Sequence, residues 1–233
     1  INKHIKDKAL RKKLTPNFKL GCKRVLLSNN YYQALAQKNV EVVTDGIEKF
    51  TKDSVVTKDG KSRKIDAIIL GTGFHVADSF QYYNVKGKDG AELKDVLGAS
   101  PEAYYGTSIH QFPNLFLMLG PNTGLGHNSM VYMIESQTNY IIDAIQKMSE
   151  QGIKSIEVRK DVQTKFNEEL QKKLEGTIWL SGCKSWYLSE DGKNHTVWPG
   201  FTLEFRNRTK NINLSDYTIE TKNVKKKKEA LAQ

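Results

Sequence analysis

Two short, continuously apolar segments of this chain each run directly into a glycine-rich turn. Residues 67–70 meet the turn at 71–73, and residues 115–119 meet the loop at 120–126. Unbroken apolarity of this kind is typical of a strand that is covered on both faces, as in a parallel sheet. Glycine at the end of such a strand lets the backbone come close to a flat or charged ligand. Because helical patterns alternate with the strands, the chain is predicted to be an α/β protein with ligand loops at its strand ends.

The remaining elements are predicted from hydrophobic periodicity and from turn residues. Helices are expected at residues 3–13, 31–37, 129–148 and 161–174, and further strands at residues 25–27, 40–43, 54–57, 62–65 and 155–159. The pair Asp59-Gly60 predicts a tight hairpin between the third and fourth of these strands. The third helix is expected to begin at Asn128 or Ser129, and Asp161 is expected to cap the fourth. The third helix carries one apolar stripe: Met130, Ile134, Ile141, Ile145 and Met148.

Neither glycine turn matches the usual fingerprint of a dinucleotide-binding loop. That fingerprint has glycine at its first, third and sixth positions, between a strand and a helix. Residues 71–76 and 124–129 have the first two glycines but lack the last. From the pattern alone, both turns are either ordinary turns or ligand loops of another kind. The second precedes a helix, whose N-terminal N–H groups would stabilise a ring system that gains negative charge on reduction, such as a flavin.

The positive charge of the chain is concentrated at its two ends. The 233 residues carry a formal net charge of +10; residues 1–24 hold nine Lys or Arg against Asp7, and residues 206–233 hold eight against three acidic residues. The middle of the chain is therefore slightly acidic. A nucleic-acid-binding domain more often carries its basic residues on one folded face, so nucleic acid is not the expected partner. A basic binding or scaffold protein is the alternative that this distribution leaves open.

Few side chains suggest chemistry by themselves. The five histidines have no metal-ligand spacing and are expected to be loop or surface residues, and no Ser-His-Asp triad is indicated. Two cysteines, Cys22 and Cys183, make no disulfide framework or zinc site, which favours a reduced, cytoplasmic protein. No apolar run is long enough for a transmembrane helix. Lys23 and Arg24 either bind a phosphate and a second anion or are simply two surface cations.

Five further motifs occur in series along the chain. They are Gly21-Cys22-Lys23-Arg24 followed by Tyr31-Tyr32, the segment Asp66 to Phe74, the two segments Phe112 to Phe116 and Gly120 to Thr123, the run Ser185-Trp186-Tyr187, and the run Trp198-Pro199-Gly200. The series resembles the Baeyer–Villiger type of flavin-dependent monooxygenase, including its hydroxyacetophenone-oxidising branch. Each motif alone is weak, but together they extend from about residue 14 to residue 208. The resemblance implies an incomplete FAD/NAD(P)-binding fold of the three-layer ββα type.

The resemblance also implies a division of the chain. Residues 1–65 would be a remnant of the NADPH-binding domain and its return to the FAD domain. Residues 66–208 would be the C-terminal part of the FAD-binding domain with a helical and aromatic extension, and residues 209–233 a basic, flexible tail. The family's two Gly-x-Gly-x-x-Gly loops and its His-containing fingerprint do not occur in this sequence. The chain is therefore expected to be the C-terminal fragment of a flavoprotein with two dinucleotide-binding domains, and to be inactive alone.

The resemblance assigns roles residue by residue. Arg24 would be the catalytic arginine, which stabilises the anionic peroxyflavin and the oxygenated carbonyl intermediate. Lys23 would bind the 2′-phosphate of NADPH, and Trp186 would contact the nicotinamide cofactor or close the site. The turn packed against FAD would be formed by Gly71, Thr72, Gly73 and Phe74, and the loop and helix start beside the flavin ring by Gly120, Pro121, Asn122 and Met130.

The implied enzyme uses NADPH to reduce FAD, forms a C4a-peroxyflavin with O2, and inserts one oxygen atom beside a ketone carbonyl. Its small-molecule substrate would be a ketone, another carbonyl compound or a soft nucleophile. Oxygenation of nitrogen or sulfur, as in the N,N-dimethylaniline monooxygenase type, is the alternative enzymatic chemistry. A related flavin disulfide reductase would need a Cys-x-x-x-x-Cys pair, which this sequence lacks.

Overall fold

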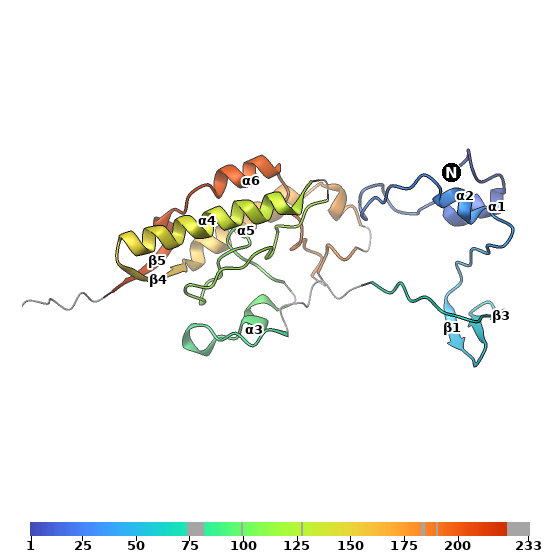
Figure 1. Cartoon of the computed structure of the whole chain (residues 1–233), viewed down its shortest axis with the longest axis horizontal. Coiled ribbons are helices and arrows are strands. Elements are labelled where there is room, and N and C mark those ends of the chain that lie inside the picture. The colour runs from blue at the N-terminus through green and yellow to red at the C-terminus, as the bar shows by residue number, and fades with distance from the viewer. Residues whose placement is uncertain (74–81, 99, 127, 183–184, 190, 223–233) are drawn as a thin grey trace, which may run out of the picture. The chain divides into compact units, whose positions relative to one another are not determined.

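The chain forms two compact units. The computed structural model describes residues 1–73, 82–98, 100–126, 128–182, 185–189 and 191–222. The first unit consists of Ile1–Leu20 with Val25–Phe74, and the second of Gly21–Arg24 with His75–Gln233. Figure 1 shows both units and labels most of their helices and strands.

The first unit contains two short helices and a small antiparallel sheet. The helices are α1 (Lys8–Leu14) and α2 (Tyr31–Leu35), and the sheet has the order β1 (Ile47–Phe50), β2 (Ser54–Thr57) and β3 (Ser62–Lys64). The Asp7 carboxylate caps α1 by accepting a hydrogen bond from the Ala9 N–H at 2.7 Å. Gly60, with φ of +82°, makes the turn between β2 and β3. The hairpin predicted from Asp59-Gly60 is confirmed, and the two early helices are confirmed with shorter bounds.

Three strands predicted in the first unit do not form. Residues 25–27, 40–43 and 67–70 have no strand assignment, and Leu27 and Ile69 are 96% and 97% exposed. A strand is stable when a neighbouring strand accepts its backbone hydrogen bonds and other side chains cover its faces. The β1–β2–β3 sheet pairs with none of the three segments. The prediction failed because an apolar pattern indicates a segment that is stable when buried, but it does not show whether a neighbouring strand is available to pair with it.

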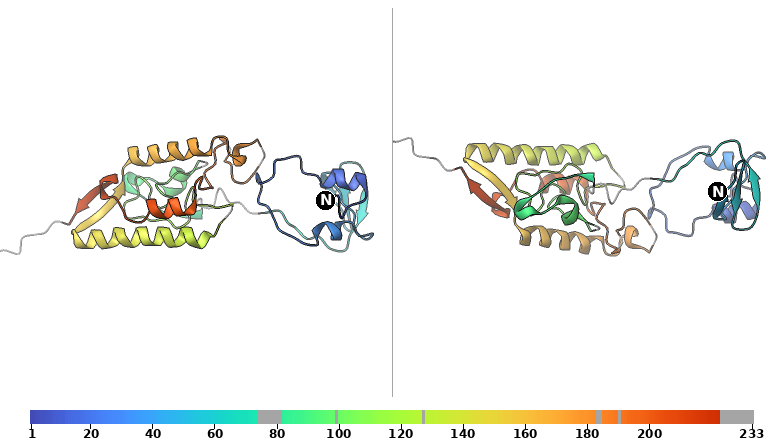
Figure 2. Two further views of the ribbon diagram at one scale, coloured as in Figure 1. Left: turned by 90° about the horizontal axis from the view of Figure 1, so that it is seen from above. Right: turned by 90° about the horizontal axis from the view of Figure 1, so that it is seen from below.

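The second unit combines several helices with a two-stranded sheet. Its elements are α3 (Leu93–Leu97), α4 (Met130–Glu150), β4 (Ile153–Val158), α5 (Lys160–Leu174), α6 (Thr202–Arg208) and β5 (Tyr217–Thr221), with 3-10 turns at Lys88–Gly90, Ile178–Leu180 and Leu214–Asp216. In both views of Figure 2, α4 and α5 lie on opposite sides of this unit. β4 and β5 pair antiparallel. The α/β class is thus confirmed, but the sheets among the described residues are antiparallel, and the predicted parallel pairing is wrong.

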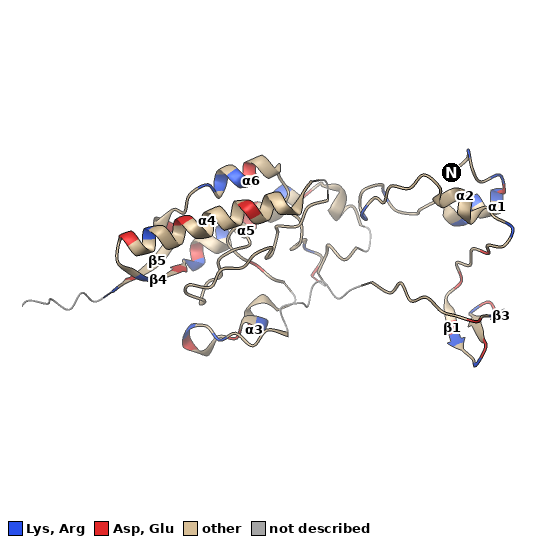
Figure 3. Ribbon diagram, in the orientation of Figure 1, with Lys and Arg blue, Asp and Glu red and all other residues tan. Residues whose placement is uncertain are grey.

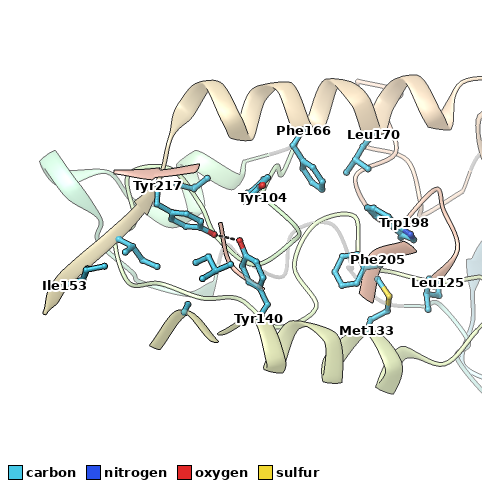
Figure 4. Close-up of a cluster of buried hydrophobic side chains, with 14 residues drawn as sticks. Tyr104, Leu125, Met133, Tyr140, Ile153, Phe166, Leu170, Trp198, Phe205 and Tyr217 are labelled. Atoms are coloured by element: carbon cyan, nitrogen blue, oxygen red, sulfur yellow. Dashed lines mark hydrogen bonds between the residues drawn. The ribbon is translucent and has the colours of Figure 1, made fainter. Parts of the chain in front are cut away.

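The main core of the second unit lies between α4 and α5. Trp198 and Phe205 are fully buried there, with ring centroids 5.1 Å apart in an edge-to-face arrangement. Figure 4 shows them between Leu170 of α5 and Met133 of α4. Burial of each side chain contributes about 1.5–3 kcal/mol through the hydrophobic effect. The indole N–H of Trp198 donates to the carbonyl oxygen of Phe201 at 3.2 Å, so its one polar atom is satisfied.

Helix α4 confirms the predicted long helix, and Met130 and Met148 of the predicted stripe pack against the core, but other positions are the fully buried ones. Its buried positions are Met133, Ser136, Gln137, Tyr140 and Ala144. Ile145, which was predicted to face the core, is 55% exposed. The prediction followed the largest apolar residues, whereas the core accepts the polar Gln137 because its amide is hydrogen-bonded to a neighbouring loop. Ser129 is the N-cap residue of α4, which confirms one of the two predicted positions, Asn128 or Ser129.

Residues 115–119 do not form the second predicted parallel strand. Phe116 makes an isolated antiparallel bridge with Ser108. Leu119 has φ of +56°, a left-handed conformation that ends extended backbone. By contrast, β4 and α5 confirm the strand and helix predicted after α4, although Asp161 lies in the first turn of α5 rather than at its N-cap.

Three hydroxyl groups form a buried chain at one end of the core. The Tyr217 hydroxyl oxygen lies 2.8 Å from that of Tyr140 and 3.0 Å from Ser108 Oγ. Figure 4 draws the contact between the two tyrosines. Burial raises the pKa of Tyr217 to about 12, because the phenolate would lose its hydration.

We expect the free energy of unfolding to fall as the pH rises from about 10 to about 12. An unfolded tyrosine ionises near its ordinary pKa of 10, whereas folded Tyr217 stays neutral up to about 12, so alkaline solution favours the unfolded state in this interval. Denaturant titrations at several pH values measure the slope. Tyr217→Phe should reduce the slope and, at neutral pH, cost about 1–3 kcal/mol, because Ser108 and Tyr140 lose a partner. The exposed Tyr82→Phe is the control; an undiminished slope in Tyr217→Phe would contradict this account.

Candidate active site

The second unit contains one cavity that unites several residues singled out by the sequence. Its volume is about 170 Å³. The walls come from the loop after Leu119, from Met130 at the start of α4, and from residues 186–189 and 195–196. Gly120, Pro121 and Trp186 are among the lining residues. Four residues that come from three separate segments of the sequence, and that were predicted to lie beside the cofactors, therefore share one cavity.

The loop that lines the cavity is held by Gln137 of α4. The side-chain oxygen of Gln137 accepts a hydrogen bond from the Leu119 N–H at 2.9 Å. Its amide nitrogen donates to Thr107 Oγ1 at 2.8 Å and to the Gly106 carbonyl oxygen at 3.0 Å. Because Gln137 is fully buried, these bonds are formed without competition from water. The glutamine thus fixes the cavity loop and the neighbouring 106–107 turn to the same helix.

Two glycines allow the cavity loop to pass the 106–107 turn closely. A Cβ atom on Gly106 would contact the Thr123 side chain and come within 2.6 Å of the Pro121 carbonyl oxygen. A Cβ on Gly120 would contact the Gly106 carbonyl oxygen. Gly106 also has φ of +60°, where side chains are strained. The absence of side chains at both positions is therefore what permits the loop geometry.

We expect Gly106→Ala to destabilise the protein by about 1–3 kcal/mol more than Gly176→Ala. Both glycines have positive φ, at +60° and +73°, so both variants carry backbone strain. No atom lies within 4 Å of a Cβ on Gly176, whereas a Cβ on Gly106 meets the backbone of Pro121. The difference between the two variants therefore isolates the close approach. Thermal and denaturant unfolding measure it, and equal losses in the two variants would show that the close approach has no cost.

Asn122 attaches the cavity loop to the segment that precedes α6. Its side-chain amide donates to the carbonyl oxygens of Asn194 at 2.8 Å and Val197 at 3.0 Å, and its backbone N–H donates to the His195 carbonyl oxygen at 2.8 Å. Gly124 and Val197 form a parallel bridge beyond it. Asn122 is buried and has φ of +56°, which asparagine tolerates better than most residues. It braces the cavity from behind rather than lining it.

His195 is a site residue that sequence reasoning missed. It was predicted to be a loop or surface residue, but it lines the cavity and is only 4% exposed. Burial lowers the pKa of His195, and the nearby Asp191 and Glu102 offset this effect only in part. The Asp191 carboxylate is partly buried, but hydrogen bonds from Ser100, Lys193 and Ser189 hold its pKa well below the usual range. No local pattern signals this burial, because it results from the packing of distant segments.

The other predicted site residues lie outside this cavity. Lys23 and Arg24 belong to the second unit and are exposed, and neither lines the cavity. Residues 71–73 belong to the first unit and are exposed, with no regular secondary structure. Phe74 lies outside the described residues. The cofactor roles predicted for these residues, and for the residues of the cavity, stay predictions.

Cys22 is fully buried and disulfide-bonded, so the prediction of a reduced cysteine is wrong at this position. Sequence spacing does not signal such a bond, because tertiary packing determines which cysteines meet. The described residues contain no group of three or more His, Cys, Asp or Glu side chains able to hold a metal ion. Among the described helices, none is long and apolar enough to cross a membrane.

Known proteins resemble the chain over most of its length, although no family model matches it. It is 50% identical over 223 residues to a Baeyer–Villiger monooxygenase of Pseudomonas aeruginosa, and the alignment covers 95% of this chain and 42% of that protein. It is 43% identical over 217 residues to a Baeyer–Villiger monooxygenase of Streptomyces coelicolor, and this alignment covers 92% of this chain and 42% of that protein. An oxidised steroid monooxygenase bound to NADP superposes with a TM-score of 0.83 and 25% identity, over 95% of this chain and 43% of that one.

Sequence and structure agree in these comparisons. The superposition shows that the described α/β architecture is that of part of a flavin monooxygenase. The chain spans less than half the length of the curated relatives that it matches. The sequence motifs predicted both the family and the partial coverage. Over the part of their length that it spans, the chain is a homologue of the Baeyer–Villiger monooxygenases.

Proposed function

We propose that the protein to which this chain belongs is an FAD- and NADPH-dependent monooxygenase that converts ketones to esters or lactones. The observation that carries the proposal is the cavity shared by Gly120, Pro121, Met130 and Trp186, which the sequence motifs predicted beside the cofactors. The 50% identity to the Pseudomonas enzyme supports the same chemistry. The substrates would be a small ketone and O2, and the cytoplasmic location predicted from composition is part of the proposal.

The cavity fits one ring of a cofactor or substrate rather than a whole dinucleotide. Its volume of about 170 Å³ is close to that of cavities of about 150 Å³ that hold a single benzene ring. The lining includes Gly120 and Gly124 together with the apolar or aromatic side chains of Leu119, Met130 and Trp186, which suit a flat ring. The sequence has no Gly-x-Gly-x-x-Gly loop for a pyrophosphate. We therefore expect the pyrophosphate groups of both cofactors to bind residues outside this chain.

The residues of this chain would position the reactants, exclude water and supply positive charge. When bound, FAD and NADPH supply the redox chemistry with O2. The loop fixed by Gln137 and Asn122 forms a rigid wall, and Met130 and Trp186 keep water from the reacting ring. Arg24 would stabilise negative charge that develops during oxygen insertion, and Lys23 would bind the 2′-phosphate of NADPH. Both cations are exposed here, so their roles require that the complete protein covers them.

A second enzymatic chemistry and one binding function compete with this proposal. Oxygenation of nitrogen or sulfur would use the same cofactors, and product analysis separates it from ketone oxidation. A basic scaffold would need a surface of unpaired positive charge. Figure 3 shows acidic residues interspersed with basic ones on α4, α5 and α6. Two of these pairs are Arg206–Glu135 at 2.8 Å and Lys173–Glu204 at 2.7 Å. The charges on these helices therefore favour the enzyme over the scaffold.

A hybrid protein tests the proposed function. In this hybrid, the chain replaces the matching part of the Pseudomonas relative, which covers 95% of the chain at 50% identity. The expected result is NADPH oxidation that is stimulated by a ketone and accompanied by ester or lactone formation. The relative itself is the positive control. A folded, flavin-containing hybrid that oxidises NADPH without forming any ester from a panel of ketones would sink the proposal.

We expect the 233-residue chain to be purified without FAD and to show no flavin absorption in the visible spectrum. The reason is that it lacks a pyrophosphate loop, which supplies most of the anchorage of such a cofactor. Dialysis of the chain against FAD, followed by gel filtration, measures retention. The hybrid is the comparison and should be yellow. A yellow 233-residue chain with one equivalent of FAD would overturn this expectation.

A further inference from the structure

A buried imidazole in the cavity has no hydrogen-bond partner among the described residues. The side chain of His195 is only 3% exposed, and neither of its ring nitrogens forms a hydrogen bond. Nε2 lies 3.7 Å from Asp191 Oδ2, which is too long for a hydrogen bond. Buried polar groups are nearly always hydrogen-bonded in folded proteins. Since His195 lines the cavity, a molecule in the cavity is the natural source of the missing partner.

Asp191 does not fill this role at a distance of 3.7 Å, and its carboxylate already accepts three other hydrogen bonds. Ser100 Oγ donates to Asp191 Oδ2 at 2.7 Å, and Ser189 Oγ and the Lys193 N–H donate to Oδ1 at 2.8 and 3.1 Å. Burial lowers the pKa of His195 and outweighs the opposite effect of Asp191 and Glu102, while the third charged group nearby, Lys193, lowers it further. The imidazole is therefore neutral near pH 7. A neutral imidazole offers one N–H donor and one nitrogen acceptor.

The rest of the cavity limits the kind of molecule that fits. A volume of about 170 Å³ accommodates one six-membered ring with a small substituent. Leu119, Met130 and Trp186 supply apolar walls. Thr123 is a polar lining residue, but its hydroxyl donates to the Gly120 carbonyl oxygen at 2.7 Å. The combination of a ring-sized space with apolar walls and a buried imidazole without a partner favours a ring that carries a hydrogen-bonding group.

We propose that His195 is a positioning residue, whose N–H donates a hydrogen bond to the carbonyl oxygen of a six-membered ring bound in this cavity. Two molecules of the proposed function have this chemistry: a cyclic ketone substrate and the nicotinamide ring of NADPH with its carboxamide. The choice of these two molecules rests on the proposed function. The hydrogen bond itself depends only on the cavity and can be tested without catalysis.

The first experiment measures binding to the full 233-residue chain. Cyclohexanone, nicotinamide and cyclohexane are titrated while histidine imidazole signals are followed by NMR and tryptophan emission by fluorescence. Cyclohexanone or nicotinamide should shift the His195 signals, and cyclohexane should bind at least about tenfold more weakly than the better of the two, which corresponds to one hydrogen bond of about 1.4 kcal/mol. If cyclohexane binds as tightly, or if neither carbonyl compound binds, the proposal is wrong.

Two substitutions separate the hydrogen bond from the packing. His195→Leu removes the donor and should weaken binding of the carbonyl compound about tenfold, whereas His195→Gln keeps a donor and should weaken it less than about threefold. Each variant is first checked for a native unfolding transition. If His195→Leu does not fold, the affinity of His195→Gln and the histidine NMR signals of the unsubstituted chain decide whether the hydrogen bond forms. His110→Leu is the control, because His110 bonds the Val158 carbonyl oxygen outside the cavity. Unchanged affinity in a folded His195→Leu would overturn the proposal.

Steady-state kinetics of the hybrid then identify the source of the ring. A higher KM for the ketone with an unchanged KM for NADPH in His195→Leu supports the substrate, and the reverse supports the nicotinamide. Both KM values unchanged, in an active hybrid that contains His195→Leu, would contradict the positioning role. A hybrid without activity toward any ketone would refute the proposed function, while the binding experiment would still decide the hydrogen bond of His195.

Discussion

Replacing Arg24 with alanine in the hybrid is expected to lower the rate of ketone oxygenation by about 10²–10³-fold, with a smaller effect on flavin reduction by NADPH. A fixed cation that faces charge developing in the transition state contributes to that step alone. Reduction of the flavin precedes oxygen insertion and does not use this charge. Stopped-flow reduction and quantified ester formation therefore report separately on the two steps.

The control for Arg24→Ala is Lys12→Ala, which removes an exposed cation from α1 in the other unit. It should leave both steps unchanged within about twofold, because an isolated surface charge contributes little. Lys23→Ala should instead raise the KM for NADPH and leave the reaction with saturating NADPH nearly intact. Ester formation within about threefold of the unsubstituted rate in Arg24→Ala would remove Arg24 from the mechanism.

Replacing Trp198 with alanine is expected to lower the free energy of unfolding by about 3–5 kcal/mol. The indole is fully buried and packs against Phe205 at 5.1 Å, so the substitution leaves a large cavity between α4 and α5. For a protein of ordinary stability, this loss is a large fraction of the total. Denaturant unfolding followed by circular dichroism measures the loss.

Trp198 also lies next to the candidate site. Its backbone N–H donates to the Gly124 carbonyl oxygen at 2.9 Å, which places the core directly behind the cavity loop. The control Trp186→Ala removes an indole that is 48% exposed and should cost about 1 kcal/mol or less. Similar losses in the two variants would contradict the description of Trp198 as the centre of the core.

The parts of the fold that local sequence determines could be predicted well. Asp59-Gly60 and the flanking β-branched residues determine a hairpin without help from elsewhere in the chain. The helical pattern after Ser129 is long enough to be read from periodicity. Residues 67–70 and 115–119 have equally clear apolar patterns, but their structure depends on partner strands. Non-local pairing, rather than weak signals, limited the prediction.

The candidate site divides in the same way. Gly120, Pro121, Met130 and Trp186 were found from a series of motifs, and the structure brings all four to one cavity. His195 and Gln137 have no such motif, because a polar residue in a loop or helix looks the same in sequence whether it is buried or exposed. Their importance became visible only through their burial and their hydrogen bonds, which distant segments create.

Oxygen transfer to a ketone is the central claim, and isotopically labelled dioxygen tests it most directly. The hybrid is incubated with NADPH, cyclohexanone and labelled O2, and the product is analysed by mass spectrometry. The account predicts a lactone that carries one labelled oxygen atom, in an amount that matches the ketone-stimulated NADPH oxidation. A folded hybrid that consumes NADPH but forms no labelled lactone from cyclohexanone, while a parallel incubation with an amine or a sulfide yields a labelled N-oxide or sulfoxide, would contradict it.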